Sequence, residues 1–213
     1  MDRAELKCRA RAQLGNKLFG NTWLYAVVIC LIYNLLAGNV IVNFVEQHTT
    51  SGTVTMIFNI VALFLAGPIN YGTAYIFLKQ AREGGRADVA DLLKGFKEDF
   101  IGLFLLNFMQ TLFIGLWSLL LVVPGIVAAY SYAMSYYIRA DHPDYDWKQC
   151  ITESKRMMKG HRMELFIFDL SYIGWFIVGA ICLGIGSLWV DAYFKAGHAQ
   201  FYERLKNSPA VYC

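Results

Sequence analysis

The feature that most constrains the fold is an uncharged, mostly apolar run from Phe100 to Ile138. As one helix, at about 1.5 Å per residue, it would reach roughly 57 Å, against a hydrocarbon core of about 30 Å. The run must therefore fold back on itself. Val123-Pro124-Gly125 marks the turn region, because proline suits a helix start and glycine suits a tight bend. We expect two antiparallel membrane-spanning helices in this stretch.

Three further apolar runs, 23–45, 54–78 and 165–190, have lengths near that of a membrane span. The chain is 57% hydrophobic and 16% charged, whereas a soluble domain carries about a quarter charged residues. The first run follows a basic amphipathic segment and is too long for the apolar part of a signal peptide, so we expect it to be retained. Trp23 suits an interfacial anchor, and Pro68 should kink the second span.

Basic residues predict the topology. They precede the first span, separate the second from the third and the fourth from the fifth, and close the chain, whereas the loops at 46–52, 117–125 and 183–187 contain no lysine or arginine. Six crossings place every basic segment in the cytoplasm. We therefore predict an all-α integral membrane protein of the cell membrane, with six transmembrane helices as three hairpins, cytoplasmic amphipathic helices and both termini cytoplasmic. The expected single membrane domain covers 1–213, with a helix at 1–22 and spans at 23–45, 54–78, 100–118, 120–139, 163–183 and 186–205.

The last third leaves an alternative open. Residues 163–190 could cross once, steeply tilted, which would leave the carboxyl terminus outside. That arrangement exports Lys195, Arg204 and Lys206, so the charge rule favours a hairpin at Gly184–Gly186.

Two polar segments predict amphipathic helices. The first begins at Asp88, a suitable N-cap. The second, 146–160, alternates apolar and basic residues at helical spacing, as in helices that lie on a membrane surface. Its basic residues are candidate contacts for anionic lipid headgroups; they are Lys148, Lys155, Arg156 and Lys159.

Four ionisable residues form a candidate intramembrane polar cluster: Asp169, Asp191, Lys195 and His198. A carboxylate in hydrocarbon costs on the order of 2.5 kcal/mol or more, so by default it is paired or functional. Asp191 and Lys195 have the favourable i,i+4 order, and the Lys195 side chain could also reach Asp169. A polar pathway or headgroup site is one interpretation. An ion pair that fixes the packing of the last hairpin is the other, and we favour it.

Motifs for catalysis, metal ions and cofactors are absent from the sequence. The five cysteines are scattered, and no histidine lies at metal-ligand spacing from cysteine, aspartate or glutamate. There is no nucleophile elbow, phosphate-binding loop or H-E-x-x-H. We therefore expect no metal, no cofactor and no enzymatic activity. The net charge of +3 is too small to indicate nucleic acid. The expected partners are the bilayer and its anionic lipids, with a second copy of the chain or another membrane protein as open alternatives.

Several stretches carry a resemblance to a known family. They are Leu121–Val127, Tyr130–Met134, Asp141-His-Pro, Glu153–His161, Leu165–Trp175, Gly184–Trp189 and Phe201–Glu203. Together they resemble domain-of-unknown-function family nine hundred and seventy-five, found mainly in Gram-positive bacteria. The pattern is also distantly similar to the membrane domain of some glycerophosphodiester phosphodiesterases. The resemblance implies a six-helix plasma-membrane protein with no assigned activity. Family members tend to have proline before the tyrosine that starts the last helix, where this chain has Ala192.

Three functions follow as hypotheses. The leading one is a non-enzymatic membrane protein that engages lipid or a membrane partner. The second is a small transporter or channel with a polar path through the last helix hairpin. A membrane-embedded enzyme that acts on lipid ranks last, because no acid–base pair or nucleophile stands out.

Overall fold

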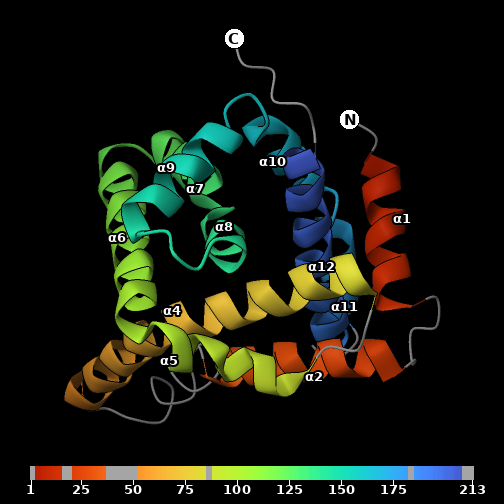
Figure 1. Cartoon of the computed structure of the whole chain (residues 1–213), viewed down its shortest axis with the longest axis horizontal. Helices are drawn as coiled ribbons and strands as arrows, with labels where there is room; N and C mark the ends of the chain where they lie inside the picture. Colours follow the sequence, from red (N-terminus) through yellow and green to blue (C-terminus); the bar gives the residue numbers. More distant parts are fainter. Residues whose placement is uncertain (1–2, 16–20, 37–51, 85–87, 182–184, 208–213) are drawn as a thin grey trace.

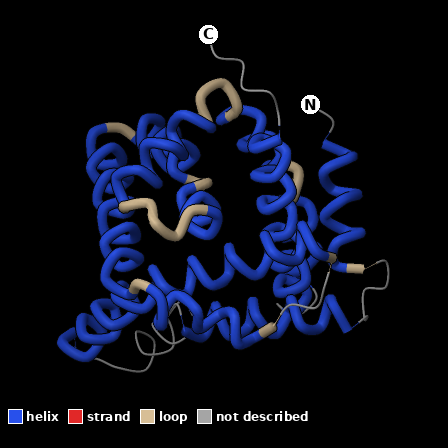
Figure 2. The backbone as a smooth tube through the Cα atoms, viewed as in Figure 1, coloured by secondary structure: helices blue, strands red, loops and turns tan. Residues whose placement is uncertain are grey.

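A computed structural model of the chain describes residues 3–15, 21–36, 52–84, 88–181 and 185–207. All regular secondary structure in these ranges is helical, which confirms the predicted all-α class (Figure 2). The elements are α1 (Arg3–Leu14), α2 (Asn21–Leu36), α4 (Gly52–Glu83), the 3₁₀ helix η1 (Val89–Leu93), α5 (Lys94–Glu98), α6 (Phe100–Leu120), α7 (Val122–Tyr132), α8 (Ser135–Asp141), α9 (Trp147–Met157), α10 (Arg162–Leu170), α11 (Ile173–Ile181) and α12 (Ile185–Asn207).

The long apolar run folds back as α6 and α7. The fourth predicted span, 120–139, is not one continuous helix, because α7 ends at Tyr132 and α8 begins at Ser135. The chain turns at Leu121, whose backbone is extended (φ −160°, ψ 143°) and which ends α6 and begins α7. The turn therefore comes slightly before the predicted Val123-Pro124-Gly125. Pro124 lies in the first turn of α7, where its missing N–H removes no helical hydrogen bond. A Cβ on Gly125 would meet Ser118 of α6, so glycine lets the two helices approach closely.

Two described helices are long and apolar enough to cross a membrane, judged by length and composition: Asn59–Glu83 within α4, and Phe100–Leu120, which is α6. The shorter apolar stretch Thr22–Leu35 lies in α2, and its predicted continuation to residue 45 lies outside the described residues. The structure thus supports two of the six predicted crossings by this measure.

The fifth predicted span, 163–183, is not one continuous helix. α10 ends at Leu170 and α11 begins at Ile173. The break coincides with a contact from the amino-terminal helix, because the Lys7 ammonium donates to the carbonyl of Ser171 at 3.1 Å. The last predicted span, 186–205, coincides with α12, and the residues between α11 and α12 lie outside the described ranges.

α4 and α12 organise the packing. α4 contacts α2, α6, α8 and α12, while α12 also contacts α1, α2 and α11 (Figure 1). Trp23 lies in this core and is not an exposed interfacial anchor. Its ring nitrogen donates to the carbonyl of Gly15 at 2.7 Å, and its ring packs against Tyr193.

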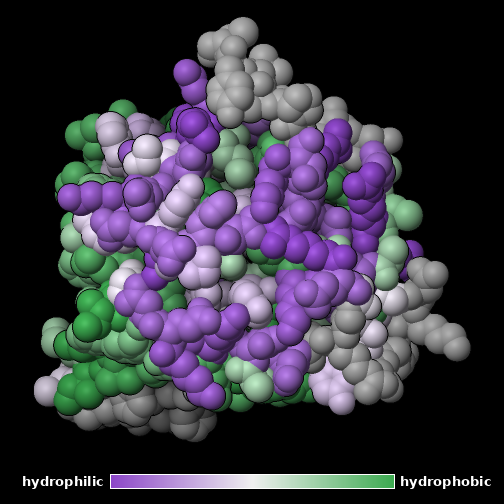
Figure 3. All heavy atoms as spheres, in the orientation of Figure 1, coloured by the Kyte–Doolittle hydropathy of each residue, from purple (hydrophilic) through white to green (hydrophobic). Residues whose placement is uncertain are grey.

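Hydrophilic and hydrophobic residues occupy different parts of the surface. Figure 3 shows hydrophilic residues across the middle of the face viewed and hydrophobic residues along its left margin, where Figure 1 places α6. α6 and α7 expose many large apolar side chains, including Leu119, Leu120, Leu121, Val122 and Val123.

Candidate functional site

The four residues predicted to form a polar cluster lie in the structure as two separate pairs. His198 of α12 lies 2.8 Å from a carboxylate oxygen of Asp169 on α10, and the two side chains are 15% and 17% exposed. Within α12, Lys195 lies 3.2 Å from Asp191, one helical turn away, as their spacing predicts. The carboxylate of Asp169 therefore pairs with His198, and Lys195 takes a different partner.

Each pair is completed by aromatic rings. Lys195 places its ammonium 3.4 Å from the centroid of the Tyr33 ring on α2, a cation–π contact. The ring of His198 lies 4.4 Å from that of Phe194, centroid to centroid. The Lys195–Asp191 contact is within ion-pair range but lacks hydrogen-bond alignment. The two pairs tie α12 to α10 and to α2.

The predicted basic helix, 146–160, corresponds to α9, which ends at Met157, so Lys159 lies in the turn just after it. The local sequence explains where α9 begins. Asp146 caps it in a capping box with Gln149, which satisfies backbone donors at the helix start. Ser154 on its buried face donates to the carbonyl of Ser131 at 2.8 Å and accepts from the backbone N–H of Met134 at 3.2 Å. These bonds fix α9 against the end of α7.

The four basic residues predicted to contact lipid are all exposed: Lys148, Lys155, Arg156 and Lys159. Lys148 and Lys155 lie over the rings of Trp147 and Tyr132 respectively. Arg156 pairs with Glu153 at 2.7 Å. On the opposite, buried face, burial raises the pKa of the Cys150 thiol to about 11, so that cysteine stays protonated at neutral pH.

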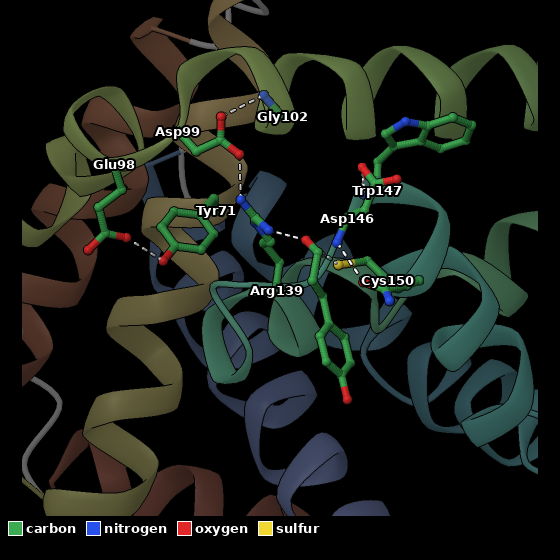
Figure 4. Close-up of polar contacts among 10 residues, drawn as sticks. Tyr71, Glu98, Asp99, Gly102, Arg139, Asp146, Trp147 and Cys150 are labelled. Atoms are coloured by element: carbon green, nitrogen blue, oxygen red, sulfur yellow. Dashed lines mark hydrogen bonds and ion pairs between the residues drawn. The ribbon is translucent and has the colours of Figure 1, made fainter.

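A network around Arg139 was not predicted from the sequence (Figure 4). Arg139 of α8 has a side chain only 10% exposed, and it pairs with Asp99 at 2.5 Å. It also donates to the backbone carbonyl of Tyr145. Asp99 caps α6 by accepting from the N–H of Gly102 at 2.9 Å. Beside them, the Tyr71 hydroxyl of α4 donates to Glu98 at 2.8 Å.

This network borders a cavity of about 230 Å³. The lining residues are Tyr71, Glu98, Asp99, Leu103, Arg139 and Pro143. The cavity thus lies where α4, the start of α6, and the segment after α8 meet.

A second unpredicted network centres on Asp141, at the end of α8. Its side chain is 3% exposed and pairs with Arg82 and with Lys206, each at 2.6 Å. Tyr202 donates a third bond at 2.7 Å. Burial alone would raise the pKa of Asp141, but the hydrogen bonds from these three groups outweigh it and lower that pKa to about 2. The ends of α4, α8 and α12 are held together at this carboxylate.

In the described part of the chain, no group of three or more His, Cys, Asp or Glu residues could hold a metal ion. Of the cysteines described there, Cys8 is exposed, whereas Cys30 and Cys150 are buried; all three are free thiols.

The comparisons with known proteins give one match. The family model described as "Protein of unknown function (DUF975)" matches residues 1–131 and 119–208, which confirms the resemblance to family nine hundred and seventy-five. No curated protein and no solved structure matches the chain.

Proposed function

We propose that this chain, which belongs to the DUF975 family of proteins of unknown function, is an integral membrane protein of the cell membrane. It binds anionic lipid headgroups at α9. In this proposal the protein acts by holding lipid, or a membrane partner, and catalyses no reaction. Six crossings, both termini in the cytoplasm and α9 on the cytoplasmic side are part of the proposal. They rest on the distribution of lysine and arginine along the chain.

One observation carries the proposal: the apolar surface of the α6–α7 hairpin adjoins a helix with exposed basic residues. Large apolar side chains are exposed along α6, where Ile101 is 76% exposed and Leu112 is 49% exposed. Soluble monomers rarely expose contiguous apolar patches larger than a few hundred Å². α9 packs against both α6 and α7. An element with exposed lysines next to an apolar surface matches the boundary between hydrocarbon and headgroups.

The charges of α9 set the expected strength of headgroup binding. A Lys or Arg near an anionic membrane surface contributes about 1 kcal/mol. Lys155 and Lys148 present their charges over aromatic rings, and Arg156 shares its charge with Glu153. We therefore expect Arg156 to contribute less than the three lysines.

Reconstitution into nanodiscs tests the proposal. Native mass spectrometry would count the anionic lipids retained from mixed phosphatidylcholine and phosphatidylglycerol discs. Replacing Lys148, Lys155, Arg156 and Lys159 together by glutamine should reduce that retention at least tenfold. A matched variant with the three lysines changed to arginine and Arg156 to lysine keeps every charge and should retain lipid like the wild type. Equal retention by the glutamine variant would overturn the headgroup assignment.

Membrane insertion needs its own test, because it is independent of lipid choice. The native protein should stay in the membrane fraction after alkaline carbonate extraction. Release into the supernatant would overturn the integral-membrane part of the proposal.

A transporter or channel is the second candidate, and the Asp169–His198 pair favours it. A carboxylate and an imidazole in contact at 2.8 Å, both largely buried, are groups that can pass a proton or coordinate a polar solute. The pair equally serves to fix α10 on α12, which is the interpretation we favour.

A further inference from the structure

The cavity beside Arg139 has the wrong charge for an anionic lipid. Among its lining residues, two carboxylates, Glu98 and Asp99, face one guanidinium, a net charge of −1 before the Lys94 ammonium near Glu98 is counted. The guanidinium of Arg139 is already held by Asp99 and by the carbonyl of Tyr145. Since the one cation in its lining already has partners, the cavity favours a positively charged ligand.

Glu98 is the carboxylate best placed to receive that ligand. One of its oxygens accepts from the Tyr71 hydroxyl at 2.8 Å. The other lies 3.4 Å from the ammonium of Lys94, longer than the about 2.7–2.9 Å of a charge-assisted hydrogen bond. Lys94 also lies 3.8 Å from the Tyr75 ring centroid. A ligand cation therefore competes with the loosely held Lys94 ammonium for this second Glu98 oxygen.

The size and lining of the cavity indicate which class of cation it binds. Its volume of about 230 Å³ is below the about 300–1,000 Å³ of sites for drug-sized ligands. Quaternary ammonium ions prefer cages of several aromatic rings, whereas the ring of Tyr71 is the aromatic one in this lining. A primary ammonium instead carries three N–H donors, which suit carboxylate oxygens.

We propose that this cavity binds a primary ammonium group, with Glu98 as its carboxylate partner and Tyr71 beside it (Figure 4). The group belongs either to a free small amine or to the headgroup of an aminophospholipid. The lipid source rests on the proposed function: Asp99 caps α6, so if α6 crosses the bilayer, the cavity lies at headgroup depth.

The first experiment uses the full chain in neutral detergent, titrated with ethanolamine hydrochloride by calorimetry at constant ionic strength. Glu98→Gln removes the charge and keeps an oxygen acceptor for Tyr71, and it should weaken binding at least tenfold. Glu98→Asp keeps the charge and should bind more tightly than Glu98→Gln. The control is Glu164→Gln, a carboxylate of matching exposure (38% against 40%) that also contacts a neighbouring side chain, His161. It should bind like the wild type.

Tyr71→Phe separates ligand binding from a structural role. It removes the phenol that occupies one Glu98 oxygen but keeps the ring, so ethanolamine binding should stay within about threefold of the wild type or tighten. If the Tyr71–Glu98 bond served only to join α4 to α5, Tyr71→Phe would lower thermal stability and the wild type would not bind the amine. Absence of ethanolamine binding, equal binding by Glu98→Gln, or equally tight binding of tetramethylammonium would overturn the proposal.

The second experiment distinguishes the sources. Nanodiscs of phosphatidylcholine with phosphatidylethanolamine are analysed by native mass spectrometry. Retained aminophospholipid that Glu98→Gln releases assigns the site to a lipid headgroup, whereas ethanolamine binding without lipid retention assigns it to a free amine. The α9 variants should leave both measurements unchanged. If the wild type retained no anionic lipid, the proposed function would be overturned, whereas the ammonium site would be unaffected.

Discussion

Tyr202 of α12 donates a hydrogen bond to Asp141 of α8 at 2.7 Å, across 61 positions of sequence. The rings of Tyr202 and Tyr137 stack in the same region, with centroids 5.6 Å apart. Because Arg82 and Lys206 also converge on Asp141, one carboxylate joins an early, a middle and a late helix. The last helix is thereby fixed to the rest of the molecule at its carboxyl-terminal end.

We expect Asp141→Asn to lower the thermal unfolding midpoint of the protein in detergent. The amide keeps the shape of the side chain but loses the charge that Arg82 and Lys206 neutralise. Hydrogen bonds to charged groups contribute about 1.5–3 kcal/mol. Arg82 and Lys206 are partly exposed and can turn to water, so the loss should fall toward the lower end. An unchanged midpoint would show that the network contributes nothing to stability.

The pH dependence of stability should reveal the same carboxylate. The pKa of Asp141 is lowered from 3.8 to about 2 in the folded protein. Its stabilisation is therefore present above pH 3.8 and is lost as pH falls toward 2. The unfolding midpoint of the wild type should therefore fall between pH 4 and 2 by more than the midpoint of Asp141→Asn. Parallel curves for the two proteins would contradict this assignment.

A glycine contact between α4 and η1 gives a prediction about packing. A Cβ on Gly72 would meet the backbone of Leu92, which cannot move aside as a flexible side chain can. Gly72→Ala should destabilise the protein by about 1–3 kcal/mol. Gly115→Ala in α6 is the control, because a Cβ there meets nothing within 4 Å. Alanine at that position should be neutral or stabilising by up to about 1 kcal/mol, from helix propensity alone.

The Asp169–His198 pair distinguishes a structural role from transport. We expect proteoliposomes of the wild type to show no proton or small-solute flux above protein-free vesicles. We also expect Asp169→Asn to keep the retention of anionic lipid, since asparagine can still accept from His198. Flux in the wild type that Asp169→Asn abolishes would establish the transporter alternative and displace the lipid-holding function.

Local sequence predicts those parts of the fold that local chemistry determines. The run from Phe100 to Ile138 is too long for one span, and Pro124 favours a helix start, so the α6–α7 hairpin follows from the sequence. The start of α9 follows from its cap at Asp146 and the spacing of its buried residues. The i,i+4 contact of Asp191 with Lys195 was likewise predictable, because helix geometry brings such residues together.

Contacts between distant residues carry no comparable signal. Arg139 and Asp99 are 40 positions apart, and nothing in their spacing indicates that they meet. Arg139 stood out in the sequence only as one basic residue among those that predict topology. Nor does spacing indicate that Lys7, at the other end of the chain, contacts Ser171 at the break between α10 and α11. The cavity follows from these long-range contacts, so it could be found only in the structure.

Arg139 itself yields the last prediction. It joins Asp99 at the start of α6 to the carbonyl of Tyr145 in the segment after α8, and this needs the forked guanidinium, which lysine lacks. Arg139→Lys should lower stability by about 1.5–3 kcal/mol, because one charge-assisted bond is lost in a largely buried place. Arg156→Lys, at an exposed position of α9, should change the unfolding midpoint little. Similar midpoints for both variants would mean that a single ammonium holds the segment after α8 as well as the forked guanidinium does.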